Sequence, residues 1–227
     1  MFIDEGPFVQ TITIRMEHYG NEYFKIQKRV GCVGGVLNKF KFENDVEEND
    51  VLMDFGCGGG YLLSNFSNAN KFGYEINPSA IDNCKSLGIR VYNNFDDIED
   101  KSVNVIISNH ALEHVTHPYD ILETLKKKLV IGGKLVVVVP CEQPSEQSFY
   151  FKENDNNQHL HTWSPMTLGN LVNVVGFKVL SSLPFQHQWC PDYEKNYNAP
   201  DFHQRCTNYA KNNGNYQIKL VAVKCND

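Results

Sequence analysis

Short apolar segments alternate with segments of helical periodicity from residue 51 towards the C-terminus. Apolar runs bounded by glycine, proline or asparagine are typical of strands, and apolar residues spaced three and four apart are typical of helices. The predicted strands cover residues 51–55, 71–75, 89–93, 103–108, 134–139, 177–181 and 218–223. The predicted helices cover residues 61–66, 78–87, 119–129 and 164–175. This alternation indicates an α/β fold with a doubly wound, mostly parallel sheet.

Residues at the ends of the predicted helices support these boundaries. Pro78 and Pro165 stand where a first helical turn begins, and Ser164 has the side chain of an N-cap. Lysines at 126–128 complement the dipole at a helix C-terminus. Residues 134–139 are almost wholly apolar, which favours a strand buried on both faces.

Two segments fall outside the alternation. Residues 19–42 place apolar side chains at helical spacing, and we expect that helix to break at Gly31, Gly34 and Gly35. Residues 185–215 are aromatic and polar, and longer than an ordinary connection between strands. We expect this second segment to contain a helix and to form a lid or wall of a ligand pocket. The N-terminal helix is then a candidate for the opposite wall. The alternative is that the aromatic residues of 185–215 simply cover the edge of the sheet.

Composition narrows the function classes. The chain has 227 residues with a formal net charge of −6, which argues against a nucleic-acid partner because binding a phosphate backbone needs clustered cations. No apolar run is long enough to span a membrane, and the first ten residues lack the pattern of a signal peptide. The seven cysteines include no C-x-x-C pair, so we expect reduced thiols and a cytoplasmic location.

A glycine-rich turn follows the first predicted strand, with the sequence Gly56-Cys57-Gly58-Gly59-Gly60. In a doubly wound sheet such a turn lies at the carboxyl edge, where its N–H groups can contact a ligand. Asp54 precedes the turn, and Glu75 ends the next strand, where a carboxylate can accept hydrogen bonds from both hydroxyls of a ribose. A G-x-G-x-G spacing, with Tyr61 where dinucleotide enzymes have a third glycine, favours a ligand with one nucleoside and no pyrophosphate. It disfavours a nicotinamide oxidoreductase.

On these residues the chain resembles the class I S-adenosylmethionine-dependent methyltransferases, from about Val51 to Val139. The resemblance implies a Rossmann-like sheet of seven strands with an antiparallel last strand. It also implies S-adenosyl-L-methionine as cofactor, with the turn at 54–60 around its methionine part and Glu75 on its ribose. The positions that contact adenine in this family correspond to residues 93–95 here, with Asn94 in place of the usual Asp.

The resemblance assigns a set of residues to cofactor binding. They are Asp54, Gly56, Cys57, Gly58, Gly60, Glu75, Ile76, Asn94, Phe95, Asn109 and Gln27.

The acceptor is predicted from the segment 108–115, Ser-Asn-His-Ala-Leu-Glu-His-Val. It resembles the stretch after strand four in the small-molecule branch of the family, and it lacks the Pro-Pro-aromatic sequence of amino-group methyltransferases acting on adenine or glutamine. Looser matches at 23–27, 34–35 and 159–165 resemble methyltransferases of polysaccharide and natural-product gene clusters. We therefore expect a small-molecule acceptor, with a hydroxyl group, for example of a sugar, as the first choice. The alternatives are a nitrogen or carbon acceptor, and a catalytically silent cofactor-binding protein.

A hydroxyl acceptor must lose a proton, and histidine is suited to take it near neutral pH. We expect His114 or His159 to be this base, with His110 as a third candidate; a structural role for each is the alternative. Glu113 beside His114 raises the question of a metal. Adjacent helical residues point about 100° apart and rarely share an ion, so we expect none.

The chain is thus expected to be one methyltransferase domain, 1–227. Within it, residues 1–45 form an N-terminal helical cap and 46–140 the cofactor-binding core. Residues 141–227 form a substrate-side half that contains the 185–215 insertion. A homodimer is left open as the state of association.

Overall fold

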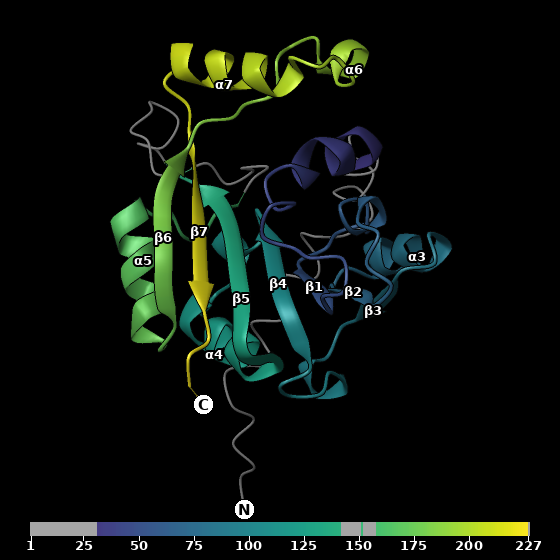
Figure 1. The fold of residues 1–227 in the computed structure, drawn as a ribbon, viewed down its shortest axis with the longest axis vertical. Coiled ribbons are helices and arrows are strands. Elements are labelled where there is room, and N and C mark those ends of the chain that lie inside the picture. Colours follow the sequence, from purple (N-terminus) through teal and green to yellow (C-terminus); the bar gives the residue numbers. More distant parts are fainter. Residues whose placement is uncertain (1–30, 142–150, 152–157, 227) are drawn as a thin grey trace, which may run out of the picture.

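The computed structural model describes residues 31–141, 151 and 158–226. Its described residues form one sheet of seven strands in the order β3-β2-β1-β4-β5-β7-β6 (Figure 1). The strands are β1 (Leu52–Phe55), β2 (Lys71–Tyr74), β3 (Arg90–Tyr92), β4 (Val103–Asn109), β5 (Leu129–Pro140), β6 (Lys178–Phe185) and β7 (Gln217–Val223). The strands β1 to β5 pair in parallel, and β7 runs antiparallel to both β5 and β6. The predicted fold class and the antiparallel last strand are confirmed.

Five labelled α-helices accompany the sheet in the described part of the chain. They are α3 (Pro78–Ser86), α4 (Pro118–Lys128), α5 (Pro165–Val174), α6 (Tyr193–Asn196) and α7 (Phe202–Asn212). The helix-start signals act as predicted. Ser164 and Thr167 form a reciprocal capping box at α5, and the Asn77 side chain accepts a hydrogen bond from the Ser79 N–H at α3.

The predicted helix at 61–66 is wrong in extent. Only a short 3₁₀ turn, η1 (Leu63–Asn65), forms there. The Asn65 side chain donates a hydrogen bond to the Tyr61 carbonyl at 2.8 Å, and asparagine bonds of this kind compete with helical hydrogen bonding.

The predicted break in the N-terminal helix is also wrong, because residues 31–39 are helical through all three glycines. A Cβ on Gly31 would lie 2.3 Å from the Tyr61 ring, and one on Gly35 would lie 2.2 Å from the Tyr61 carbonyl oxygen. The glycines therefore permit close packing of this helix on the turn after β1. Their helix-weakening effect is overridden by tertiary contact.

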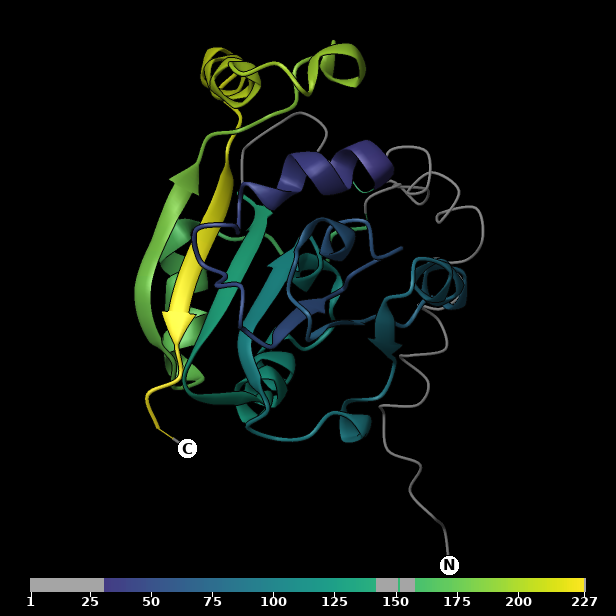
Figure 2. The same cartoon turned by 45° about the vertical axis from the view of Figure 1, so that its right-hand side comes forward.

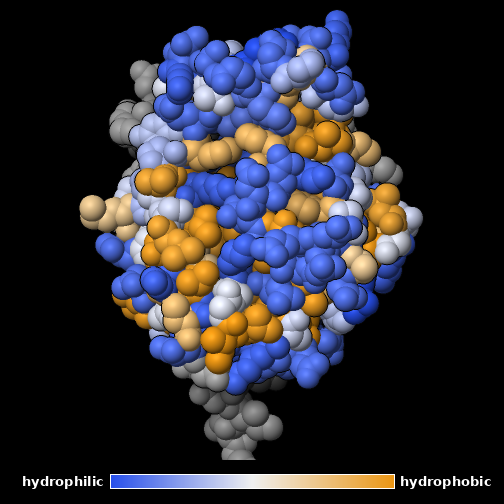
Figure 3. Space-filling view, viewed as in Figure 1, coloured by the Kyte–Doolittle hydropathy of each residue, from blue (hydrophilic) through white to orange (hydrophobic). Residues whose placement is uncertain are grey.

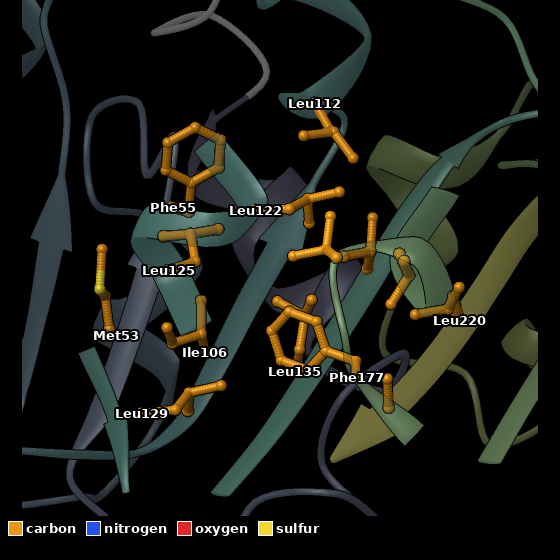
Figure 4. Close-up of a cluster of buried hydrophobic side chains, with 14 of the residues drawn as sticks. Met53, Phe55, Ile106, Leu112, Leu122, Leu125, Leu129, Leu135, Phe177 and Leu220 are labelled. Carbon is orange, nitrogen blue, oxygen red and sulfur yellow. The ribbon is translucent and has the colours of Figure 1, made fainter. Parts of the chain in front are cut away.

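Two hydrophobic clusters cover the two faces of the sheet. Met53, Ile106 and Leu135 from the central strands pack with Leu122 and Leu125 of α4 (Figure 4). On the opposite face, alternate residues of the same strands pack against η1 and the segment around Phe42. Because both faces are covered, all four residues of β1 are buried, as its continuous apolar sequence predicts.

The helical residues 31–39 and the helices α6 and α7 lie over the carboxyl ends of the parallel strands (Figure 2). A third cluster joins them, with Leu37 against Phe202, Cys190 and Cys206. Residues 31–39 and the 185–215 segment thus pack together as one cover. The predicted N-terminal helix before residue 31 lies outside the described residues. Mainly hydrophilic residues face solvent on α6 and α7 at the top of the view in Figure 3.

Two further observations bear on the sequence expectations. All seven cysteines lie among the described residues and are free thiols. No helix within the described ranges has both the length and the apolar composition needed to cross a membrane.

Candidate functional site

A cavity of about 180 Å³ lies above the glycine-rich turn, under the cover described above. Five of the residues assigned to cofactor binding line it, and they come from the turn and from the end of β4: Asp54, Gly56, Cys57, Gly58 and Asn109. Gly34 and Trp189 line it from the cover. A Cβ on Gly34 would lie 3.0 Å from the Trp189 ring, so a larger residue there would press on this wall.

The glycine-rich turn needs glycine for its backbone shape. Gly56, Gly58 and Gly60 have φ angles of 73°, 53° and 81°, in the left-handed region that other residues rarely adopt. A Cβ on Gly56 would also lie only 2.3 Å from the Cβ of Ala111. The turn after β1 is therefore held directly against the turn after β4.

Glu75 is tied to the glycine-rich turn. Its carboxylate accepts hydrogen bonds from the Gly58 N–H at 2.8 Å, and from the N–H groups of Ile76 and Asn77 at 2.8 and 2.9 Å. Burial raises the pKa of this carboxyl, and the three N–H groups act against that rise. These contacts bring Glu75 and the glycine-rich turn together, and the role of Glu75 in cofactor binding stays a prediction.

Asp54 is buried in the cavity wall, and its Oδ1 accepts no hydrogen bond from any described residue. Burial, together with the nearby Glu75 carboxylate, raises the pKa of Asp54 well above its usual value. Buried polar atoms are normally paired, so a donor from a bound ligand would satisfy this oxygen.

The other residues assigned to the cofactor do not line the cavity. Gly60 packs against Cys84 and Ile89, and Asn94 caps a 3₁₀ turn, η2 (Phe95–Asp97). The Phe95 ring stacks on Tyr74 with centroids 3.9 Å apart. Ile76 is partly exposed beside Glu75, and Gln27 lies outside the described residues. Cofactor contacts by these residues stay predictions.

His110 is the most constrained of the three candidate bases. It adopts a left-handed φ of 53°, and its Nε2 lies 2.9 Å from Oε1 of Gln217. The Gln217 amide is oriented by its own partners, because Nε2 donates to the His187 carbonyl and Oε1 accepts from Lys41. The His110 Nε2 must therefore carry a proton and donate, which makes that nitrogen unsuitable as a base.

Lys41 and Gln217 belong to this site and were missed from the sequence. The buried Lys41 Nζ donates to Oδ1 of Asn109 at 3.0 Å and to Oε1 of Gln217 at 2.9 Å. Burial lowers the pKa of Lys41 to about 7, although the charge of Glu113 acts to raise it. Gln217 reaches the site because β7 pairs antiparallel with β5, opposite Pro140. No local motif marks either residue.

Glu113, His114 and His159 come together, and we call them the Glu–His–His cluster. One nitrogen or oxygen atom from each lies within 4.8 Å of the others. Glu113 and His114 were expected to point apart on a helix, but His114 Nε2 lies 4.0 Å from Oε1 of Glu113 at the end of the 3₁₀ turn η3 (Leu112–His114). Burial acts to raise the pKa of Glu113, but the facing His110 and His114 rings outweigh it and hold the pKa below its usual value.

Residues 33–182 match the family model described as a methyltransferase domain. The chain belongs to this family. It is a class I S-adenosylmethionine-dependent methyltransferase, as its seven-stranded sheet and glycine-rich turn predict. No curated protein matches the sequence significantly.

Solved structures share the fold of this methyltransferase at low sequence identity. One is a chain of the complex between the Trm112 methyltransferase activator of Haloferax volcanii and a methyltransferase. It is 18% identical, with a TM-score of 0.62, and the match covers 90% of this chain and 94% of that one. The S-adenosylmethionine-dependent methyltransferase from Archaeoglobus fulgidus is 17% identical, with a TM-score of 0.59 over 83% and 93%. Geranyl diphosphate C-methyltransferase from Streptomyces coelicolor A3(2) is 15% identical, with a TM-score of 0.56 over 79% and 72%.

The cavity of this methyltransferase fits its cofactor. The glycines leave room for a ligand against the backbone, and Oδ1 of Asp54 can accept a hydrogen bond from an ammonium group. Asp54 and Glu75 are two carboxylates close to one cavity, an arrangement that suits the positive charges of a sulfonium and an ammonium.

The contact between the two turns predicts a specific coupling. Gly56→Ala should lower the free energy of unfolding by more than the roughly 1–2 kcal/mol of a left-handed alanine, because of the clash with Ala111. Adding Ala111→Gly removes the clashing atom and should recover all but that cost. Urea unfolding of the two single variants and the double variant measures the coupling. The loss in free energy of unfolding of the double variant should be smaller than the sum of the losses of the two single variants. If the losses simply add, the two turns do not meet as described.

The lowered pKa of the buried Lys41 predicts that the free energy of unfolding depends on pH. Its pKa is about 7 in the folded protein and 10.5 in the unfolded chain, so the unfolded chain binds more protons between these values. The Lys41 contribution to stability is therefore lowest below pH 7 and grows as the pH rises towards 10.5. The pKa of the neighbouring His187 is lowered to about 3, chiefly by burial, so that ring does not titrate in this window.

In Lys41→Met this rise should disappear. The stability of the variant relative to the wild type should fall between pH 7 and pH 9.5, with a slope approaching one proton. Urea unfolding at several pH values measures it. Parallel pH profiles of the two proteins would show that Lys41 stays charged when buried.

Proposed function

We propose that this enzyme transfers a methyl group from S-adenosyl-L-methionine to a hydroxyl group of a small molecule, for example a sugar. The observation that carries the proposal is the Glu–His–His cluster beside the glycine-rich turn. A hydroxyl acceptor needs help to lose its proton, whereas an amine or an activated carbon needs less, so histidines in this place favour oxygen. The net charge of −6 supports a small acceptor over a nucleic acid.

We assign the parts of the cofactor to residues in the cavity wall and to residues outside it as follows. Asp54 accepts a hydrogen bond from its ammonium group, and the turn at 56–60 surrounds its methionine part. Glu75 takes the ribose hydroxyls. Ile76, Asn94 and Phe95 lie along the adenine. When bound, the cofactor supplies an electrophilic methyl group, which passes to the acceptor as the carbon–sulfur bond breaks.

The protein's own part in the reaction is to hold the acceptor in line and to remove its proton. His114 and His159 are the residues assigned to proton removal. His110 is assigned a positioning role, because its two nitrogens lie against Gln217 and Glu113. The free thiols support the cytoplasm as the place of action.

The cofactor assignment predicts the effect of removing Glu75. Glu75→Ala should weaken binding of S-adenosylhomocysteine by about 1–3 kcal/mol, the usual loss for a charged hydrogen-bond partner. Isothermal titration calorimetry measures this, with NAD as a ligand that should not bind. Asp82→Ala removes an exposed carboxylate on α3 and is the matched control. An unchanged dissociation constant for Glu75→Ala would place the ribose elsewhere.

The acceptor assignment is tested by turnover. Transfer of labelled methyl from S-adenosylmethionine is followed over a panel of sugars, phenols and amines, and NMR identifies the new bond. With a hydroxyl acceptor, His114→Ala and His159→Ala should lower kcat while S-adenosylhomocysteine binds as before. His161→Ala, in the same loop, should keep wild-type turnover. A product with only nitrogen–methyl or carbon–methyl bonds would contradict the proposal.

A further inference from the structure

We propose that the Glu–His–His cluster is a binding site for one divalent transition-metal ion. The three side chains come from two separate segments, the 3₁₀ turn η3 after β4 and the segment that begins at Gln158. Their ligating atoms lie within 4.8 Å of one another. Nitrogen and oxygen ligands at about 2.0–2.2 Å from a zinc ion stand up to roughly 4 Å apart, so small side-chain rotations bring all three onto one ion.

The state of Glu113 gives an independent reason to expect a cation. Its side chain is fully buried, and its Oε2 accepts no hydrogen bond from any residue in the described ranges. Oε1 lies 3.3 Å from Nδ1 of His110. A buried carboxylate with one oxygen unpaired is costly, and a metal ion is a partner that lowers the cost.

The backbone holds the two segments together without the ion. The Glu113 carbonyl accepts hydrogen bonds from the Leu160 N–H at 2.9 Å and the His161 N–H at 3.2 Å. These bonds keep His159 next to His114. The two imidazole rings meet edge to face, with centroids 5.0 Å apart. The ligands are therefore arranged before an ion arrives. His110, in contact with Glu113, lies where an outer-shell residue orients a metal-binding carboxylate.

The ligand types select the class of ion. Two imidazoles and one carboxylate suit Zn²⁺, Fe²⁺ or Co²⁺, whereas Mg²⁺ and Ca²⁺ prefer oxygen ligands throughout. Three protein ligands leave coordination positions open, as in catalytic sites and unlike closed structural ones.

The use of the ion rests on the function proposed above. A hydroxyl oxygen bound to the ion loses its proton more readily, because the metal stabilises the negative oxygen. The O–H bond breaks, its electron pair stays on oxygen, and the proton passes to water. That oxygen then forms the new bond to the methyl carbon as the carbon–sulfur bond breaks. In this form His114 and His159 act as ligands, and water rather than a histidine accepts the proton.

Binding is tested with Co²⁺ alone, on full-length protein first stripped with a chelator. Wild-type protein should take up one ion with visible ligand-field bands and without the charge-transfer absorption of a cobalt–thiolate bond. His159→Gln changes an exposed residue, so its fold should be intact, and circular dichroism checks this. It and the near-isosteric Glu113→Gln should weaken binding about 100-fold or more, since even outer-shell changes cost 10–100-fold. His161→Gln should bind as wild type.

Several results would overturn the site. They are no uptake at millimolar Co²⁺, thiolate absorption, or equal affinity of His159→Gln and the wild type. Methyl transfer is measured separately, with stripped and reloaded protein. Tight Co²⁺ binding without any hydroxyl methylation would leave the metal site standing and contradict the proposed acceptor. Full hydroxyl methylation by stripped protein would contradict the catalytic use of the ion and support direct proton removal by histidine.

Discussion

The close approach of Gly56 to Ala111 is the constraint on which the site depends. A side chain at Gly56 would meet Ala111 at 2.3 Å, so the turns after β1 and β4 can lie against each other only with glycine there. These two strands are neighbours at the centre of the sheet, and their carboxyl ends meet at the same edge. The contact therefore places the cofactor cavity directly beside the turn that carries His110, Glu113 and His114.

Buried charge is concentrated at this edge of the sheet. Asp54 and Glu75 lie near the cavity, whereas Lys41 and Glu113 lie around Asn109 and the turn that follows it. Burying a charge is unfavourable unless a partner compensates for it, and the pKa values of Asp54 and Lys41 are shifted towards the neutral forms for this reason. A positively charged cofactor near Asp54 and a cation beside Glu113 would both relieve this cost.

Local sequence patterns predict those parts of the fold that depend on neighbouring residues. The capping box of α5 and the buried run of β1 follow from side-chain chemistry within a few positions. The patterns fail where a distant contact decides the outcome. Residues 31–39 are helical despite three glycines, because Tyr61 packs into the space that missing side chains leave. The segment after the glycine-rich turn does not continue as a helix, since Asn65 bonds back to Tyr61.

The sequence by itself determined the fold class, the family and the glycine-rich turn with its acidic partner, because these are set by short-range spacing that any single chain displays. Only the tertiary structure decided which polar residues meet. Lys41 donates to Asn109 and to Gln217, which lies near the other end of the chain, and His159 lies beside Glu113 although α4 and β5 separate them in sequence. Their meeting depends on the antiparallel placement of β7 beside β5 and on backbone hydrogen bonds to the Glu113 carbonyl. Contacts between residues so far apart leave no periodic signal in a sequence, because nothing in the local pattern records which strand or loop will pack alongside.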